Sequence, residues 1–152
     1  IIYEDNSFSS TSLYCEDLDQ DMDLDIVVTN NDEIIWFENL GNSNFSAPNI
    51  ILASASGTNS VIAADLDGDG DFDLAAVNDK IIWFENLGNG IFGIEQVFST
   101  TPANPYRIYF EDLDLDLDDD IICNPDLLTQ QMSFQHQNYP SSLSIKSGLR
   151  QR

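Results

Sequence analysis

Three runs of alternating aspartates are the residues best suited to do chemistry. They occupy residues 17–25, 65–73 and 112–120 and hold 16 of the 20 Asp residues, so the acids are not spread over a solvated face. In a tightly curled loop, alternate side chains point inward, toward a common centre. A hard cation such as Ca²⁺ needs six to eight oxygen ligands arranged around it in this way. Each run therefore predicts one calcium site. The candidate ligands are Asp17, Asp19, Asp21, Asp23 and Asp25; Asp65, Asp67, Asp69, Asp71 and Asp73; and Asp112, Asp114, Asp116, Asp118 and Asp120.

The second run contains the most complete loop. Gly70, at position 6, permits a sharp backbone turn, position 7 is expected to offer its carbonyl oxygen, and Asp73 closes the site at position 9. Met22 and Leu117 stand in place of Gly70 in the other two runs. If the backbone there is left-handed, a side chain costs on the order of 1–2 kcal/mol, so the second loop should bind the ion most tightly.

The residues argue against an EF-hand or a dockerin-like variant, although the loop begins like an EF-hand. An EF-hand needs Glu at position 12 and flanking helices. Position 12 is Ala76 in the second run, with Val28 and Cys123 in the others, and the flanking segments are short and apolar like strands.

The net charge limits the partners. The chain has 27 acidic and 5 basic residues among 152, a formal charge of −22, so it repels phosphate. Nucleic acid and anionic membrane surfaces are excluded as partners on this ground. No apolar stretch is long enough for a membrane-spanning helix, so no membrane insertion is expected.

The sequence repeats itself with a period of 47–48 residues. Ile-Ile-Trp-Phe-Glu-Asn-Leu-Gly-Asn at residues 34–42 recurs unchanged at residues 81–89. The second repeat contains three apolar runs, at 61–64, 74–77 and 81–84, and a fourth strand is expected within 92–98. No segment has helical periodicity. Four short strands per repeat of this length are typical of β-propeller blades, so the predicted fold class is all-β.

Blade boundaries follow from the period. Complete blades are predicted at about 12–59 and 60–106, a partial blade at 107–125, and the last strand of a preceding blade at 1–3. Residues 126–152 lack the repeat pattern and are expected to pack poorly. Because propellers close with about four to eight blades, the chain is predicted to be a fragment whose partners include the remaining blades.

Other reactive residues are few. Cys15 and Cys123 lie in apolar strand patterns and are expected to be buried free thiols. His136 is the single histidine, so no Ser/His/Asp set can be assembled without it, and no catalytic residues are predicted. Trp36 and Trp83 are expected to pack between neighbouring blades, with stacking on sugars as the alternative.

The loop pattern Asp-x-Asp-x-Asp-Gly-x-x-Asp, the apolar strand after it, Trp-Phe-Glu-Asn-Leu-Gly-Asn and the Phe92-Gly93 step together resemble the FG-GAP/VCBS repeat family. The resemblance covers roughly residues 1–125 and departs from the pattern at Met22 and Ser46. It implies integrin-type blades of a seven-bladed propeller, placement outside the cell as a secreted or cell-surface protein, and a role in adhesion or ligand binding. It does not imply catalysis.

The expected function is therefore a calcium-binding extracellular scaffold for adhesion or ligand binding, with an unidentified protein or glycan as ligand. Two alternatives remain open. The first alternative is a non-catalytic propeller attached to a secreted glycosidase or lyase, and the second is a propeller lectin.

Overall fold

The computed structural model describes residues 10–30, 33–54, 57–100, 105–111, 120–125 and 133–134. Within these ranges every regular element is a β-strand, as the sequence predicts. No helix in the described part of the chain is long and apolar enough to cross a membrane.

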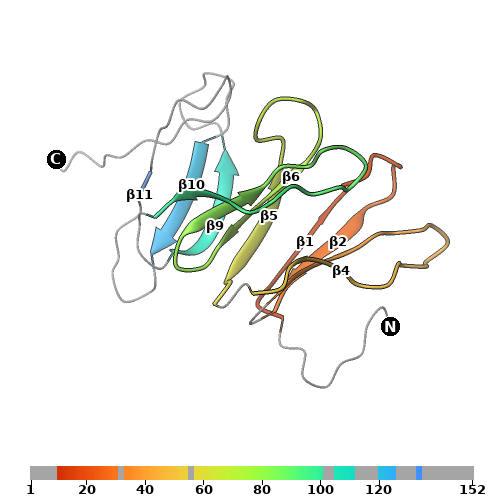
Figure 1. Cartoon of the computed structure of the whole chain (residues 1–152), viewed down its shortest axis with the longest axis horizontal. Coiled ribbons are helices and arrows are strands. Elements are labelled where there is room, and N and C mark those ends of the chain that lie inside the picture. The colour runs from red at the N-terminus through yellow and green to blue at the C-terminus, as the bar shows by residue number, and fades with distance from the viewer. Residues whose placement is uncertain are drawn as a thin grey trace.

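The strands form three antiparallel sheets that lie side by side (Figure 1). The first sheet contains β1 (Ser12–Glu16), β2 (Asp25–Thr29), β3 (Ile34–Phe37) and β4 (Asn49–Leu52). The second contains β5 (Ser60–Ala64), β6 (Asp73–Val77), β7 (Ile81–Phe84) and β8 (Gln96–Ser99). The third contains β9 (Pro105–Glu111), β10 (Asp120–Pro125) and β11 (Ser133–Phe134). In every sheet, strands consecutive in the chain are neighbours, which is the order found in a propeller blade.

The sheets are related as successive blades. The first strands of neighbouring sheets lie next to each other, β1 beside β5 and β5 beside β9. The two predicted four-stranded blades are therefore confirmed. The fourth strand of the second blade, expected within 92–98, begins at Gln96 and ends one residue beyond that range, and an isolated bridge between Asn86 and Phe92 precedes it.

The predicted ends of the repeat array are only partly visible. Residues 1–3 lie outside the described residues. Of 126–152 the structure describes only β11, whose Phe134 pairs with Ile122 of β10. This strand occupies the place of a third blade strand, although its sequence does not match the repeat.

The strand β6 is buried on both faces because a sheet covers each of them. Ala75 and Val77 pack in one cluster with Ile108 and Ile121 of the third sheet. Leu74 and Ala76, which point the other way, pack with residues of the first sheet, Val27 and Ile34 among them. Alternation along a strand thus divides one apolar run between two interfaces. Burying each Val, Leu or Ile side chain fully stabilises the fold by about 1.5–3 kcal/mol.

Both tryptophans pack between blades, as predicted. The Trp36 ring meets Phe92 of the second blade edge to face, with centroids 6.1 Å apart and planes at 80°. Trp83 is buried in the cluster that includes Ile108 and Ile121. Both indoles are almost fully buried, which leaves little surface for stacking on a sugar.

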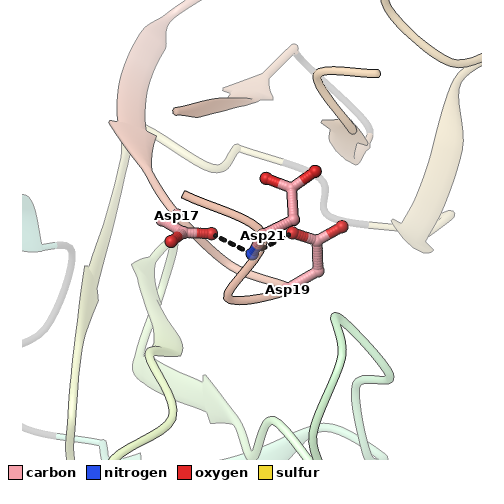
Figure 2. Close-up of side chains that lie close together, drawn as sticks. All are labelled: Asp17, Asp19 and Asp21. Atoms are coloured by element: carbon pink, nitrogen blue, oxygen red, sulfur yellow. Dashed lines mark hydrogen bonds between the residues drawn. The ribbon is translucent and has the colours of Figure 1, made fainter. Parts of the chain in front are cut away.

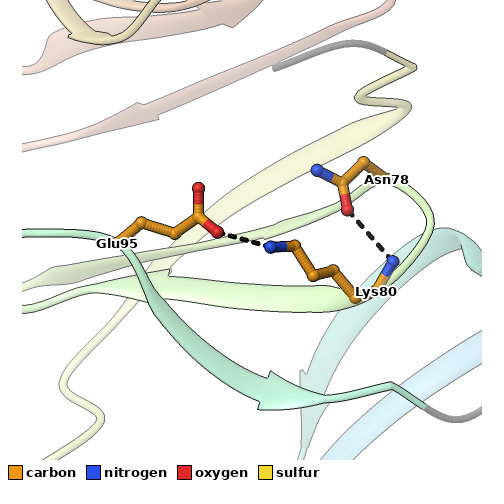
Figure 3. A network of polar contacts seen from close by, with 3 residues as sticks. All are labelled: Asn78, Lys80 and Glu95. Atoms are coloured by element: carbon orange, nitrogen blue, oxygen red, sulfur yellow. Dashed lines mark hydrogen bonds and ion pairs between the residues drawn. The ribbon is translucent and has the colours of Figure 1, made fainter. Parts of the chain in front are cut away.

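The turns between the second and third strands differ in length by one residue, and an asparagine closes each of them. In the second blade, Asn78 Oδ1 accepts a bond from the Lys80 amide at 3.0 Å, and Lys80 Nζ pairs with Glu95 at 2.5 Å (Figure 3). In the first blade, Asn30 Oδ1 accepts from the Glu33 amide at 2.7 Å. In both turns the asparagine side chain closes the turn with a hydrogen bond, so the difference of one residue does not change the register of the flanking strands.

Neither Cys15 nor Cys123 forms a disulfide, and the two residues differ in burial. Cys123 is buried, as predicted. The prediction for Cys15 is wrong, because this residue is exposed. Side chains alternate along β1, and Cys15 shares with Leu13 the face that the described residues leave open.

Gly90 is the residue over which Trp36 packs, and its replacement gives a stability prediction. A Cβ at Gly90 would lie 2.2 Å from Trp36 Cη2, and the backbone φ there is +68°. Gly90→Ala should lower the free energy of unfolding by about 2–4 kcal/mol, from overpacking plus a strained backbone, in urea denaturation.

The matched control is Gly57→Ala. Gly57 has a similar φ of +77°, but a Cβ there would meet no described atom within 4 Å. This variant should lose only the backbone term, about 1–2 kcal/mol. Equal losses in the two variants would contradict the packing of Trp36 over Gly90.

Candidate metal-binding loops

The two acidic runs that the structure describes form the loops between the first and second strands of their blades. Residues 17–24 connect β1 to β2, and residues 65–72 connect β5 to β6. Because the repeat places the loops at the same position in adjacent sheets, both emerge at the same end of the molecule.

Each described loop gathers three carboxylates. Ligand oxygens of Asp17, Asp19 and Asp21 all lie within 4.8 Å of one another, and those of Asp65, Asp67 and Asp69 do the same. Figure 2 shows the first group surrounding the curl of its loop. These are the residues predicted at positions 1, 3 and 5. Either group could hold a metal ion.

Backbone amides curl the two loops in the same way. The carboxylate at position 1 accepts a bond from the amide at position 6: Met22 to Asp17 at 3.0 Å, and Gly70 to Asp65 at 3.1 Å. The amide at position 7 donates to the carboxylate at position 5, at 2.8 Å from Asp23 to Asp21 and 2.9 Å from Asp71 to Asp69.

Position 6 has the left-handed backbone that the sequence suggested, with φ of 75° at Met22 and 95° at Gly70. Position 4 is left-handed as well, at Gln20 and Gly68 (64° and 81°), which the sequence analysis missed. The first loop therefore keeps two side-chain-bearing residues in a conformation that favours glycine, and the Met22 side chain extends into solvent.

The aspartates at position 9 accept hydrogen bonds that anchor the loops. Asp25 accepts bonds from the amides of Leu18 (3.2 Å) and Asn39 (2.7 Å). Asp73 accepts from the amides of Leu66 (3.1 Å) and Asn86 (2.7 Å). Both carboxylates are buried and lie outside the two acidic groups. They anchor the loop to the segment after the third strand, and their role as metal ligands stays a prediction.

The other predicted ligands divide into residues that lie apart from these groups and residues that the structure does not describe. Asp23 and Asp71, at position 7, lie outside both groups. Asp112, Asp114, Asp116 and Asp118 lie outside the described residues. Asp120 is described as the first residue of β10, paired with Glu111.

Burial makes several of these carboxyl groups weaker acids. It raises the pKa of Asp19, and repulsion from Asp21 and Asp17 raises it further. Burial also raises the pKa of Asp67, with repulsion from Asp69 acting in the same direction. At position 9, burial raises the pKa of Asp25 and brings that of Asp73 to about 7. A cation in the loop would favour the charged forms, so protons and metal should compete.

Blade-like sheets, two of them with a described acidic loop after the first strand, define an all-β repeat protein of propeller type. Residues 17–76 match the family model described as FG-GAP-like repeat. The match runs from the first acidic loop through the second, and this stretch is an FG-GAP-like repeat, as the sequence resemblance predicted. No curated protein matches the chain. The VCBS part of the resemblance and the calcium role of the loops stay predictions.

Three polar residues that support the loops were missed by sequence reasoning. Asn39 and Asn86 donate their backbone amides to the position-9 aspartates, and Gln20 donates to Gly70 O at 3.1 Å. Asn39 and Asn86 occupy the same place in the repeated Trp-Phe-Glu-Asn motif, which was the available signal. Gln20 gave no such signal in the sequence, because the equivalent residue in the next repeat is Gly68.

The raised pKa of Asp73 predicts how stability depends on pH. Unfolded aspartate titrates near pH 4, whereas folded Asp73 titrates at about 7. The folded state therefore binds more protons between these values. With a chelator present, the free energy of unfolding should be highest below about pH 4 as far as Asp73 contributes, and fall as the pH rises to about 7.

Urea denaturation between pH 4.5 and 7.5 (about the range of this titration) measures the slope. Asp73→Asn removes the titrating group, so its slope should be shallower than that of the unchanged chain. Parallel slopes for the two proteins would contradict the assignment.

Proposed function

We propose that this chain is a calcium-binding, extracellular β-propeller repeat module that serves as a non-catalytic scaffold for adhesion or ligand binding. The observation that carries the proposal is the repeated trio of carboxylates. The geometry of Asp17, Asp19 and Asp21 recurs at Asp65, Asp67 and Asp69. The same backbone amide bonds support both trios.

The donor set suits calcium. Calcium binds oxygen ligands at about 2.3–2.6 Å, so two oxygens on opposite sides of one ion lie about 5 Å apart. The carboxylate oxygens of each trio, within 4.8 Å of one another, fit around one such ion. Magnesium demands near-ideal octahedral geometry at about 2.0–2.1 Å, which a loop with all its ligands on one short segment supplies poorly.

Charge supports the same conclusion. Unit like charges 4 Å apart repel by about 1 kcal/mol even in water. Each loop places oxygens of three carboxylates within 4.8 Å of one another, in a chain whose formal charge is −22. A divalent cation in each loop would replace this repulsion by attraction and stabilise the stacked blades.

The extracellular and scaffold parts of the proposal rest on the FG-GAP-like repeat and on the chemistry of the loops. Calcium modules outside cells work with dissociation constants of about 10⁻⁴–10⁻³ M, which suits exposed loops such as these. The buried faces between the blades are committed to packing, so a protein or glycan ligand would meet the loops that connect the strands.

Calcium binding is tested by calorimetry. Up to three ions should bind, one to each acidic run, with dissociation constants of about 10⁻⁴–10⁻³ M. The run 65–73 should bind most tightly, because Gly70 adopts its left-handed φ without strain whereas Met22 does not. No binding heat at millimolar Ca²⁺, or tighter binding of Mg²⁺, would refute the proposal.

Chelation should lower the melting temperature, because calcium binds the folded loop far better than the unfolded chain. Asp67→Ala should remove most of the calcium-dependent rise in melting temperature. Asp79→Ala is the matched control, since Asp79 is an exposed acid in the turn between β6 and β7. If both substitutions reduced the rise equally, general charge rather than a bound ion would be responsible.

A further inference from the structure

Asn86 makes contacts on both sides of the boundary between the first two blades. Its backbone amide donates to Asp73 within its own blade, at 2.7 Å. Its side-chain Nδ2 donates to Phe72 O at 3.1 Å, also within its blade, and to Leu18 O of the first blade at 2.8 Å. Leu18 lies between Asp17 and Asp19, so Asn86 holds the backbone between two aspartates of the first acidic group.

The first blade supplies a natural comparison. Asn39 occupies the equivalent place, and its amide donates to Asp25 at 2.7 Å while its Nδ2 donates to Leu24 O at 3.1 Å. Both of these acceptors belong to its own blade. The bond to a neighbouring loop therefore distinguishes Asn86 from Asn39 in the described part of the chain.

Gln20 makes a second contact between the loops, in the opposite direction. It stands at position 4 of the first loop, and its Nε2 donates to Gly70 O at 3.1 Å and to the Asp71 carboxylate. Gly70 is the residue whose amide supports Asp65. The first loop thus helps to hold the backbone that shapes the second acidic group.

We propose that Asn86 and Gln20 are positioning residues that couple the two loops, each fixing the metal-binding geometry of the loop in the neighbouring blade. The proposal rests on the calcium function proposed above. Residues that hydrogen-bond to metal ligands and orient them change the metal affinity by about 10–100-fold when they are removed. The loss of Asn86 should therefore weaken the first loop as well as its own.

The test isolates one loop at a time in the full chain. In the first parent chain, the run 17–25 is the acidic run left intact. This chain carries Asp65→Asn, Asp67→Asn, Asp112→Asn and Asp114→Asn. Adding Asn86→Ala should weaken Ca²⁺ binding to that first loop by about 10-fold in calorimetry.

The mirror chain carries Asp17→Asn and Asp19→Asn in place of Asp65→Asn and Asp67→Asn, so that the second loop remains. In it, the matched control Asn39→Ala should leave the Ca²⁺ affinity of the second loop unchanged, because the bonds of Asn39 to described residues lie within the first blade. If losing an asparagine at this place acted only by loosening the fold, Asn39→Ala would weaken the second loop as Asn86→Ala weakens the first. Circular dichroism and the calcium-free melting temperature verify that each chain is folded.

Asn86 is buried, so Gln20→Asn provides a second variant. Gln20 is exposed, and asparagine tolerates its left-handed backbone while being too short to keep both bonds. In the mirror chain it should weaken the second loop several-fold, and it alone decides the proposal if Asn86→Ala does not fold.

Affinities unchanged by both Asn86→Ala and Gln20→Asn would overturn the coupling and leave the calcium function standing. Absence of calcium binding in both isolated-loop parents and in the unmodified chain would instead overturn the proposed function, and the coupling with it.

Discussion

A buried carboxylate at the end of each described acidic loop holds the loop to its sheet. Asp25 and Asp73 are 0 % and 1 % exposed, and each accepts two backbone amide bonds, one from the start of the loop and one from the segment after the third strand. Burying a carboxyl group without partners would be unfavourable, so these bonds stabilise the closed loop. Because they close the loop, the alternating aspartates before them turn toward a common point.

Stacking of the sheets then sets where the loops lie relative to each other. A single blade is apolar on both faces, and β6 shows the consequence: its side chains divide between a cluster with the first sheet and a cluster with the third. Trp36 fixes the first of these contacts by filling the space over Gly90 and meeting Phe92. Packing of this kind brings the second blade's Asn86 to the first blade's Leu18, a contact between residues 68 apart in the chain.

Repulsion among the acids is the opposing force. The loops concentrate carboxylates that burial makes weaker acids, as at Asp19 and Asp67. Amide bonds satisfy some of their oxygens but supply no full positive charge. A divalent cation would supply this charge, and the stability of the blades would then depend on the ion. The fold and the proposed calcium function therefore depend on the same few residues.

Much of this architecture is readable from the sequence because it is encoded locally. Alternation of apolar residues, the 47–48 residue period and the spacing of the aspartates predict strands, blades and acidic loops without knowledge of distant contacts. The trios Asp17, Asp19, Asp21 and Asp65, Asp67, Asp69 follow from positions within one short loop. Even the left-handed backbone at Met22 could be predicted, by alignment with Gly70.

The remaining features depend on which surfaces meet. Asp73 resembles its neighbours in sequence, but burial and two amide donors give it an anchoring role. Cys15 lies in an apolar run yet is exposed, because the strand directs it to the face that the described residues leave open. Asn39 and Asn86 are identical in local sequence, and only the packing of one blade against another gives Asn86 a bond to a neighbouring loop. Burial and contacts between blades are properties of the assembled sheets, so the tertiary structure decides them.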